Sequence, residues 1–151
     1  MQTFLPYKDF TQSAKALDYR RLGKQRIEAK QILMILLDET TSTAWRNHPA
    51  VKMWRSYEHS LADYGVAMCT EWRARGFVDN QLPYFTERTF AHKYPWSNGG
   101  YYYPHWLGDE RFHRAHRSNL LRKNPDFYRQ LWPLESDSYP YIWPDPMVVK
   151  V

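Results

Sequence analysis

The chain has 151 residues, a formal charge of +5 and an aromatic content of 17%. This length predicts a single domain over residues 1–151. The lone Cys69 excludes an internal disulfide, and the N-terminus lacks a secretory pattern, so we expect a cytoplasmic protein. The longest apolar run, residues 32–37, is too short to span a membrane. Positive charge combined with many rings favours nucleic-acid binding, because cations attract phosphates and rings stack on bases.

A first long helix is predicted over residues 12–37, followed by the polar segment DETTST. Its first half places several basic residues near one carboxylate, Glu28. Basic neighbours keep a carboxylate ionised and can hold phosphates around it, an arrangement that a DNA-cleaving or base-removing enzyme could use. The alternative is a solvated helix face with weak local ion pairs. Arg26 differs from the other basic residues because it lies within the apolar stripe of this helix.

A second helix is predicted from Pro49 to a stop at Gly76. Its apolar seam contains one charged residue, Glu58, and also Gly65, which would let two helices approach closely. A lone charge is unfavourable in an apolar interface. Arg26 and Glu58 are therefore predicted either to pair across the two helices or to extend to water.

Residues 78–106 lose helical periodicity and are rich in proline and aromatic residues. Such a stretch predicts an ordered loop beside a functional site. Trp96 is the ring that we expect to stack on a base, because Pro95 stiffens its approach and the sequence SNGG gives a turn after it. The alternative is that Trp96 fills the helical core.

A shorter helix is predicted over residues 109–121, and the tail YPYIWPDP is expected to lie extended. This region carries a dense group of donors suited to DNA phosphates: His113, His116, Arg117, Ser118, Asn119, Arg122 and Lys123. The alternative is an exposed basic helix end that the helix dipole favours. Although His105 and Asp109 precede these histidines at short spacings, Gly108 interrupts the pattern and no zinc signature is present. No metal is predicted.

Several segments together resemble a known family: MQTFLPY, LDYRRLGKQRIEAKQIL, NHPAVKMW, FHRAHRSNLLRKNPDFY and YIWP. They are similar to the bacterial and phage small-protein branch of the pyrimidine-dimer DNA glycosylases of the endonuclease V type. The resemblance covers nearly the whole chain and implies a compact all-α domain without a cofactor. It also implies that the N-terminal α-amine attacks the anomeric carbon of the sugar, that a glutamate on the first long helix assists, and that the resulting imine allows strand scission.

Two positions differ from the family pattern. The characterised enzyme exposes a threonine amine after loss of its initiator methionine, whereas Gln2 should block that removal here and leave the amine of Met1. The catalytic glutamate of that enzyme directly follows an arginine, whereas Ile27 separates Arg26 from Glu28. One residue rotates a helical side chain by about 100°. On the resemblance, the nucleophile is Met1 and the assisting carboxylate is Glu28.

The sequence thus predicts an all-α domain with three main helices that removes a damaged or modified base from DNA, with or without AP-lyase activity. Its partner is DNA, and neither a membrane nor an obligate protein partner is expected. Outside the third helix, the predicted DNA-binding residues are Gln2, Arg20, Arg21, Lys24, Gln25, Arg26 and Trp96. Two alternatives stay open: a non-catalytic module that recognises distorted or modified DNA, and a nucleotide or nucleoside hydrolase.

Overall fold

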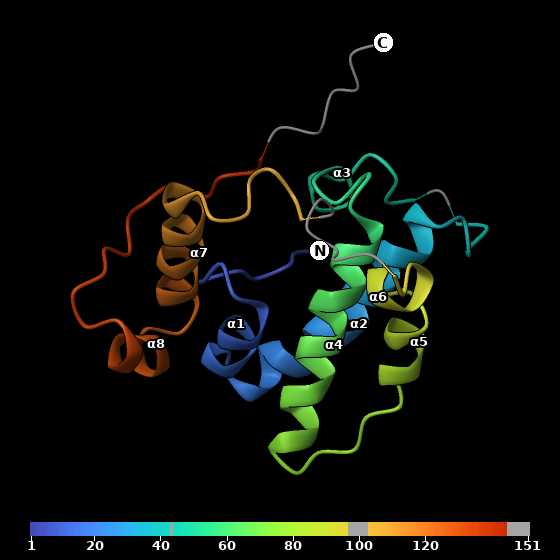
Figure 1. Cartoon of the computed structure of the whole chain (residues 1–151). Helices are drawn as coiled ribbons and strands as arrows, with labels where there is room; N and C mark the ends of the chain where they lie inside the picture. The colour runs from blue at the N-terminus through green and yellow to red at the C-terminus, as the bar shows by residue number, and fades with distance from the viewer. Residues whose placement is uncertain (43, 97–102, 145–151) are drawn as a thin grey trace.

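The computed structural model describes residues 1–42, 44–96 and 103–144, and every regular element within these ranges is a helix (Figure 1). The helices of the described residues are α1 Phe10–Ala16, α2 Tyr19–Leu36, α3 Pro49–Lys52, α4 Glu58–Ala74, α5 Leu82–Thr86, α6 Phe90–Lys93, α7 Glu110–Lys123 and α8 Pro125–Leu131. The predicted all-α fold is confirmed, with α2, α4 and α7 as its long helices. In the part of the chain that is described, no helix is long and apolar enough to cross a membrane.

The two long helices predicted at the N-terminal end are both divided. The first is split into α1 and α2, because Leu17 is extended and the Asp18 side chain caps the start of α2. The second is split into α3 and α4 by a turn in which Ser56 has a φ of 73°. The prediction of two continuous helices is wrong, because capping at Asp18 and turn geometry at Ser56 interrupt them.

The proline-rich regions contain more helix than the sequence predicts. The expected loop over residues 78–106 includes α5 and α6, and its residues 97–102 lie outside the described ranges. Pro125 begins α8, where its missing N–H leaves no bond unmade. After α8 the chain runs without helix past α7 and toward α3 (Figure 1), as expected for the described part of the tail.

The core is built around α4, which packs against α1, α2 and α5. A Cβ on Gly23 would lie 2.8 Å from the Trp72 ring, so this glycine permits the close contact between α2 and α4. Gly65 has a different partner from the one expected. A Cβ there would lie 2.2 Å from the ring of Phe85, which is fully buried on α5. Gly65 therefore makes room for an aromatic ring rather than for a second long helix.

Arg26 pairs with Asp79 and not with Glu58. Its guanidinium lies 4.6 Å from the centroid of the Trp72 ring, and the Asp79 side chain is 0% exposed. Glu58 instead accepts a hydrogen bond from the Ser56 backbone N–H, at 3.1 Å, where α4 begins. The predicted Arg26–Glu58 pair is wrong. Arg26 reaches its partner in the segment that follows α4.

Candidate active site

Residues 1–6 form an extended segment whose backbone is held by core side chains. Trp54 Nε1 donates to the Thr3 hydroxyl at 3.0 Å, and the Tyr64 hydroxyl donates to the Phe4 carbonyl at 2.9 Å. Thr3, Phe4 and Leu5 are all buried. Because a buried extended segment must find partners for its backbone groups, these contacts fix the course of the chain toward Met1.

Two histidines of α7 hold the same segment. The Leu5 N–H donates to His116 Nδ1 at 2.9 Å, and His113 Nδ1 donates to the Leu5 carbonyl at 2.8 Å. The rings are 1% exposed at His113 and 0% at His116. Burial lowers the pKa of both, that of His116 to about 3, so both rings are neutral near pH 7. The structure therefore places these two predicted DNA contacts beneath the surface.

Gln25 and Glu28 of α2 fix the start of the chain. Gln25 Oε1 accepts from the Phe4 N–H and its Nε2 donates to the Gln2 carbonyl, each at 3.1 Å. Glu28 Oε2 accepts from the Gln2 N–H and from Gln25 Nε2, again at 3.1 Å. Only the carbonyl carbon and Cα of Met1 separate the Gln2 nitrogen from the α-amine, so covalent geometry keeps carboxylate and amine in one site.

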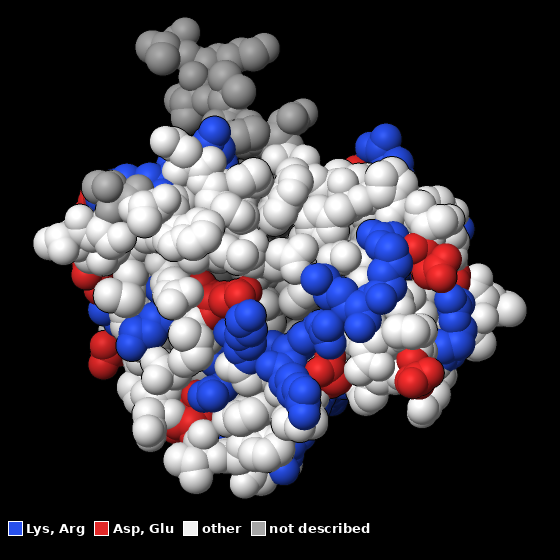
Figure 2. Space-filling view, turned by 180° about the vertical axis from the view of Figure 1, so that it is seen from behind, with Lys and Arg blue, Asp and Glu red and all other residues white. Residues whose placement is uncertain are grey.

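Met1 and Glu28 line an open cleft of about 870 Å³, within the size range of ligand sites. Six other predicted site residues line it: Gln2, Arg20, Arg21, Lys24, Gln25 and Lys123. Figure 2 shows a band of Lys and Arg side chains that crosses one face of the molecule beside a hollow, with an acidic group at its edge. A larger hollow, of about 1200 Å³, lies between α1 and α4, but neither Met1 nor Glu28 lines it.

The cations of this cleft differ in how firmly they are held. Lys24 Nζ lies 4.0 Å from Glu28 Oε1 and its side chain is 75% exposed, so it can turn toward a phosphate. Arg21 is paired with Asp18 at 3.1 Å. Burial would raise the pKa of Asp18, but hydrogen bonds from Tyr128 and Arg21 outweigh it, and the pKa is lowered. Arg21 is therefore less free to move than Lys24.

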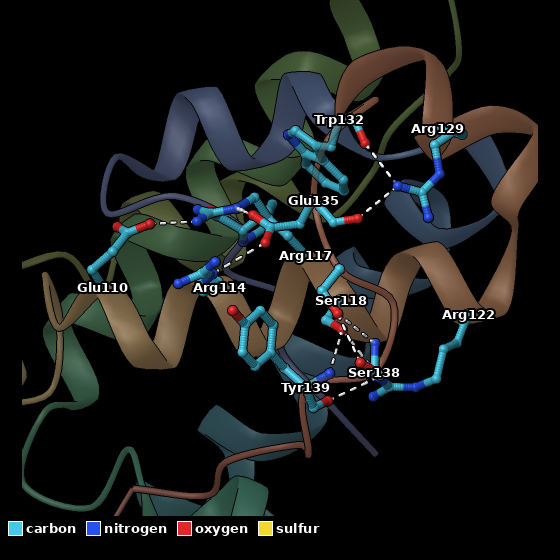
Figure 3. A network of polar contacts seen from close by, with 12 residues as sticks. Glu110, Arg114, Arg117, Ser118, Arg122, Arg129, Trp132, Glu135, Ser138 and Tyr139 are labelled. Carbon is cyan, nitrogen blue, oxygen red and sulfur yellow. Dashed lines mark hydrogen bonds and ion pairs between the residues drawn. The ribbon is translucent and has the colours of Figure 1, made fainter.

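Three of the seven predicted donors on α7, namely Arg117, Ser118 and Arg122, are hydrogen-bonded to the C-terminal segment (Figure 3). Arg117 binds Glu135 and Glu110, and it donates to the Pro6 carbonyl at 2.8 Å. Arg122 donates to two backbone carbonyls of the tail, those of Asp137 at 2.7 Å and Tyr139 at 2.8 Å. These arginines therefore fasten chain segments to α7.

The remaining predicted residues are distributed as follows. Ser118 is fully buried and accepts from the Tyr139 N–H at 3.0 Å. Asn119 is partly buried, while Lys123 is exposed and lines the cleft. Trp96 is 96% exposed, so it does not fill the core, and it lies outside the cleft lining.

His48 lies near this site and was not predicted to belong to it. It caps α3 by accepting from the Ala50 N–H at 3.0 Å, and its ring contacts Trp143. Burial and the N-terminal ammonium lower the pKa of His48, while Glu28 opposes this shift. The segment NHPAVKMW, which carries part of the family resemblance, contains His48 and is a sequence signal for it. The distance between His48 and the N-terminus is set by tertiary packing and could not be predicted from this segment.

No group of three or more His, Cys, Asp or Glu side chains in the described ranges is placed to hold a metal ion. His105, considered above as a possible ligand, is hydrogen-bonded through Nδ1 to the Tyr57 hydroxyl at 3.1 Å.

Residues 1–84 match the family model described as pyrimidine dimer DNA glycosylase. This match covers more than half of the chain, including the N-terminal segment, all of α2 and His48. It does not include α7, α8 or the tail. The other wall of the cleft comes from the junction of α7 and α8, at Lys123, Asn124 and Phe127. No curated protein and no solved structure matches the chain significantly. The matched residues include Gln2 and Glu28, whose hydrogen bond brings the N-terminus to the carboxylate. Because the match covers more than half of the chain, the chain belongs to the pyrimidine dimer DNA glycosylase family.

Proposed function

We propose that this protein removes a damaged or modified base from DNA, with the α-amine of Met1 as nucleophile and Glu28 as the assisting carboxylate. The observation that carries the proposal is the hydrogen bond from the Gln2 N–H to Glu28, 3.1 Å long, at the edge of a basic cleft. The shift of the glutamate relative to the family pattern does not separate it from the N-terminus. Gln25 and the α7 histidines act as positioning residues for the segment.

The chemistry follows from this arrangement. The neutral amine attacks the anomeric carbon, and the base leaves with the electron pair of the glycosidic bond and takes up a proton. The nitrogen then forms a second bond to this carbon as the C1′–O4′ bond breaks, and the proton that the nitrogen loses is taken up by O4′, which leaves an imine to the opened sugar. Positive charge develops on the sugar as the base departs, and a nearby carboxylate stabilises it. Glu28 Oε2 is occupied by its two donors, while Oε1 has Lys24 at 4.0 Å. The imine then permits elimination of the 3′ phosphate, which is the lyase step.

The cations around the cleft fit a phosphate backbone. We assign phosphate contacts to Arg20, Lys24 and Lys123, which are all exposed and line the cleft. Arg21 contributes charge from a fixed position beside Asp18. Arg26 stabilises the fold through Asp79 and is not part of the contact surface that we propose.

We also propose that the whole chain acts as one domain. Buried hydrophobic residues from α1, α2, α3, α4, α5, α7 and α8 belong to one core cluster. The N-terminal segment crosses from α2 to α7, so the part of the chain that matches the family model depends on the part that does not.

The test is a screen of duplexes that contain varied damaged bases, incubated with the protein and borohydride. A covalent adduct is expected, and peptide mapping should place it on Met1. Glu28→Gln keeps an acceptor for the Gln2 N–H but removes the charge, so product formation should fall about 100-fold or more while DNA affinity changes little. Glu87→Gln, which changes a carboxylate that is 65% exposed and outside the cleft, is the control and should retain full activity.

The other outcomes identify the alternatives. Abasic product without an adduct would show a glycosylase that uses water and would remove Met1 from the mechanism. An adduct mapped to a lysine would contradict the role of Met1 as nucleophile and none of the other proposed roles. Tight DNA binding without product from any substrate would indicate a non-catalytic module. Product from free nucleosides, with binding that responds little to salt, would indicate the nucleoside hydrolase.

A further inference from the structure

Phe127 is an exposed aromatic residue at the edge of the cleft that Met1 and Glu28 line. It lies in the first turn of α8, lines the cleft together with Met1 and is 38% exposed. A second ring, Tyr19, lines the cleft from the start of α2 and is 52% exposed. Neither ring is needed to close the hydrophobic core, because neither belongs to its buried cluster or to the partly buried side chains packed on it.

Phe127 is held in a fixed position. The Asn124 side chain accepts from the Phe127 N–H at 3.3 Å, and Pro125 sets the backbone of the preceding turn. The Phe127 ring packs edge to face on Tyr128, with centroids 4.9 Å apart. Tyr128 is fully buried, bonds to Asp18 and stacks on Trp132. An aromatic ring that such contacts hold in place loses little conformational entropy when it binds a ligand.

Tyr19 is more constrained by its neighbours. Its hydroxyl accepts from Arg20 Nε at 3.0 Å, and its ring is stacked with that of Phe77 at 6.4 Å. Phe77 is in turn stacked on Trp72, with centroids 4.1 Å apart. Tyr19 is the more exposed of the two rings, but it is stacked with Phe77 and its hydroxyl is bonded, whereas the contact of Phe127 with Tyr128 is edge to face. Phe127 is therefore the ring that we expect another flat group to meet.

The charges beside Phe127 select the kind of ligand. Lys123, four residues before it, and Arg20 and Lys24 of α2 line the same cleft. An apolar protein partner would leave these cations unpaired, whereas a nucleic acid supplies phosphates for the cations and base faces for the ring.

We propose that Phe127 is a wedge that enters the DNA duplex where the reacting nucleotide leaves the stack. This inference rests on the proposed function, since it requires a nucleotide to be turned out of the helix toward Met1 and Glu28. Extrusion leaves a gap beside the neighbouring base pair, and the lost stacking must be replaced. Apolar side chains fill such gaps in other DNA-binding proteins by inserting between base steps. Phe127 has the exposure, the rigid mounting and the basic surroundings for this role.

The experiment measures binding and requires no catalysis. The probe is a duplex with a tetrahydrofuran abasic analogue and a fluorescent 2-aminopurine next to it. The wild-type protein should bind it and change the fluorescence as a ring stacks on the reporter base. Phe127→Ala should weaken binding about tenfold or more and abolish that fluorescence change, whereas Phe127→Trp should keep both. Leu131→Ala, one turn further along α8, 46% exposed and outside the cleft lining, is the matched control and should behave as wild type.

Single-stranded DNA with the same analogue provides the second arm. Because a single strand has no stacked duplex gap to fill, Phe127→Ala should bind it within about twofold of wild type. An equal loss on both substrates would overturn the wedge, as would unchanged binding of the duplex or an equal loss in Leu131→Ala. If no borohydride adduct forms with the wild-type protein, the proposed chemistry fails, and the fluorescence result still decides the role of Phe127.

Discussion

At the scale of single residues, Arg26 shows what a helical pattern determines and what it leaves open. The pattern placed Arg26 correctly in the interface between α2 and α4, where its guanidinium lies over Trp72. It could not identify the partner, because Asp79 belongs to an irregular segment that turns back over the end of α4. That turn is fixed by side-chain bonds to the backbone, such as Trp72 Nε1 to the Val78 carbonyl at 3.0 Å. Such bonds produce no periodic pattern in the sequence, so the turn could not be predicted from it.

Removing the Asp79 carboxylate should be strongly destabilising. Asp79→Ala leaves Arg26 unpaired in a site that is 13% exposed, and it removes the acceptor of the Leu82 N–H at 2.9 Å. We expect a loss of about 3 kcal/mol or more in the free energy of unfolding, measured by urea denaturation. Glu58→Ala, at the residue first expected to be the partner, should cost about 1 kcal/mol or less, since it removes one helix-end contact. Equal losses in the two variants would contradict the assignment.

At the scale of elements, α7 was expected to present its donors to DNA, and it mainly holds two chain segments that have no regular structure of their own. The helix predicted over residues 109–121 from the breaking signals around it agrees closely with the observed Glu110–Lys123. These local signals could not predict the engagement of His116 with Leu5 or of Arg122 with the tail, since those partners are remote in sequence or irregular in structure. Backbone groups that lie outside secondary structure must be satisfied by side chains, and donors on a neighbouring helix meet this need.

The contact between α7 and the N-terminal segment should be lost in acid. The pKa of His116 is about 3 in the folded protein, lowered by burial from its ordinary 6.5. Below pH 6.5, therefore, the His116 ring of the unfolded chain binds a proton, whereas the ring of the folded chain stays neutral until the pH approaches 3. His116 stabilises the fold fully above pH 6.5, and the free energy of unfolding falls as the pH drops from there toward 3, by up to about 1.4 kcal/mol per pH unit.

His116→Asn tests this dependence. The Asn Oδ1 can still accept from the Leu5 N–H, but it cannot be protonated in this range. Urea denaturation at several pH values between 6.5 and 4 should show a shallower slope for the variant than for the wild type. Some slope should remain, because burial also lowers the pKa of His113. An unchanged slope would mean that the His116 ring reaches water.

At the scale of the whole molecule, the cleft has one wall that could be predicted from the sequence and one wall that could not. The basic segment around Glu28 and the N-terminal motif predicted one wall of the cleft, because those residues are close in sequence or belong to a recognisable pattern. The other wall comes from the junction of α7 and α8, where Lys123 and Phe127 lie. Its position depends on the histidines and arginines of α7, which are tertiary contacts. The same dependence explains why Phe127 carried no signal in the sequence.

A cleft with two basic walls predicts a specific salt dependence of DNA binding. Each phosphate contact that releases a counterion contributes about 0.9 to the slope of log Kobs against log salt concentration for duplex DNA. Lys24→Gln on α2 and Lys123→Gln at the end of α7 should each reduce the slope by about that amount, and the double variant by about twice as much. Titrations of a fluorescent duplex at several salt concentrations would measure these slopes.

The control lies on the same helix as Lys123. Arg111 is 86% exposed, is paired with Asp109 at 2.9 Å and sits at the opposite end of α7, outside the cleft lining. Arg111→Gln changes the net charge as much as Lys123→Gln does, so any difference between them reports position and not total charge. If both variants reduced the slope equally, DNA would respond to the overall field of the protein. A reduction confined to Lys24→Gln and Lys123→Gln would mean that the phosphate backbone crosses both walls, which is the path that brings a duplex over Met1, Glu28 and Phe127.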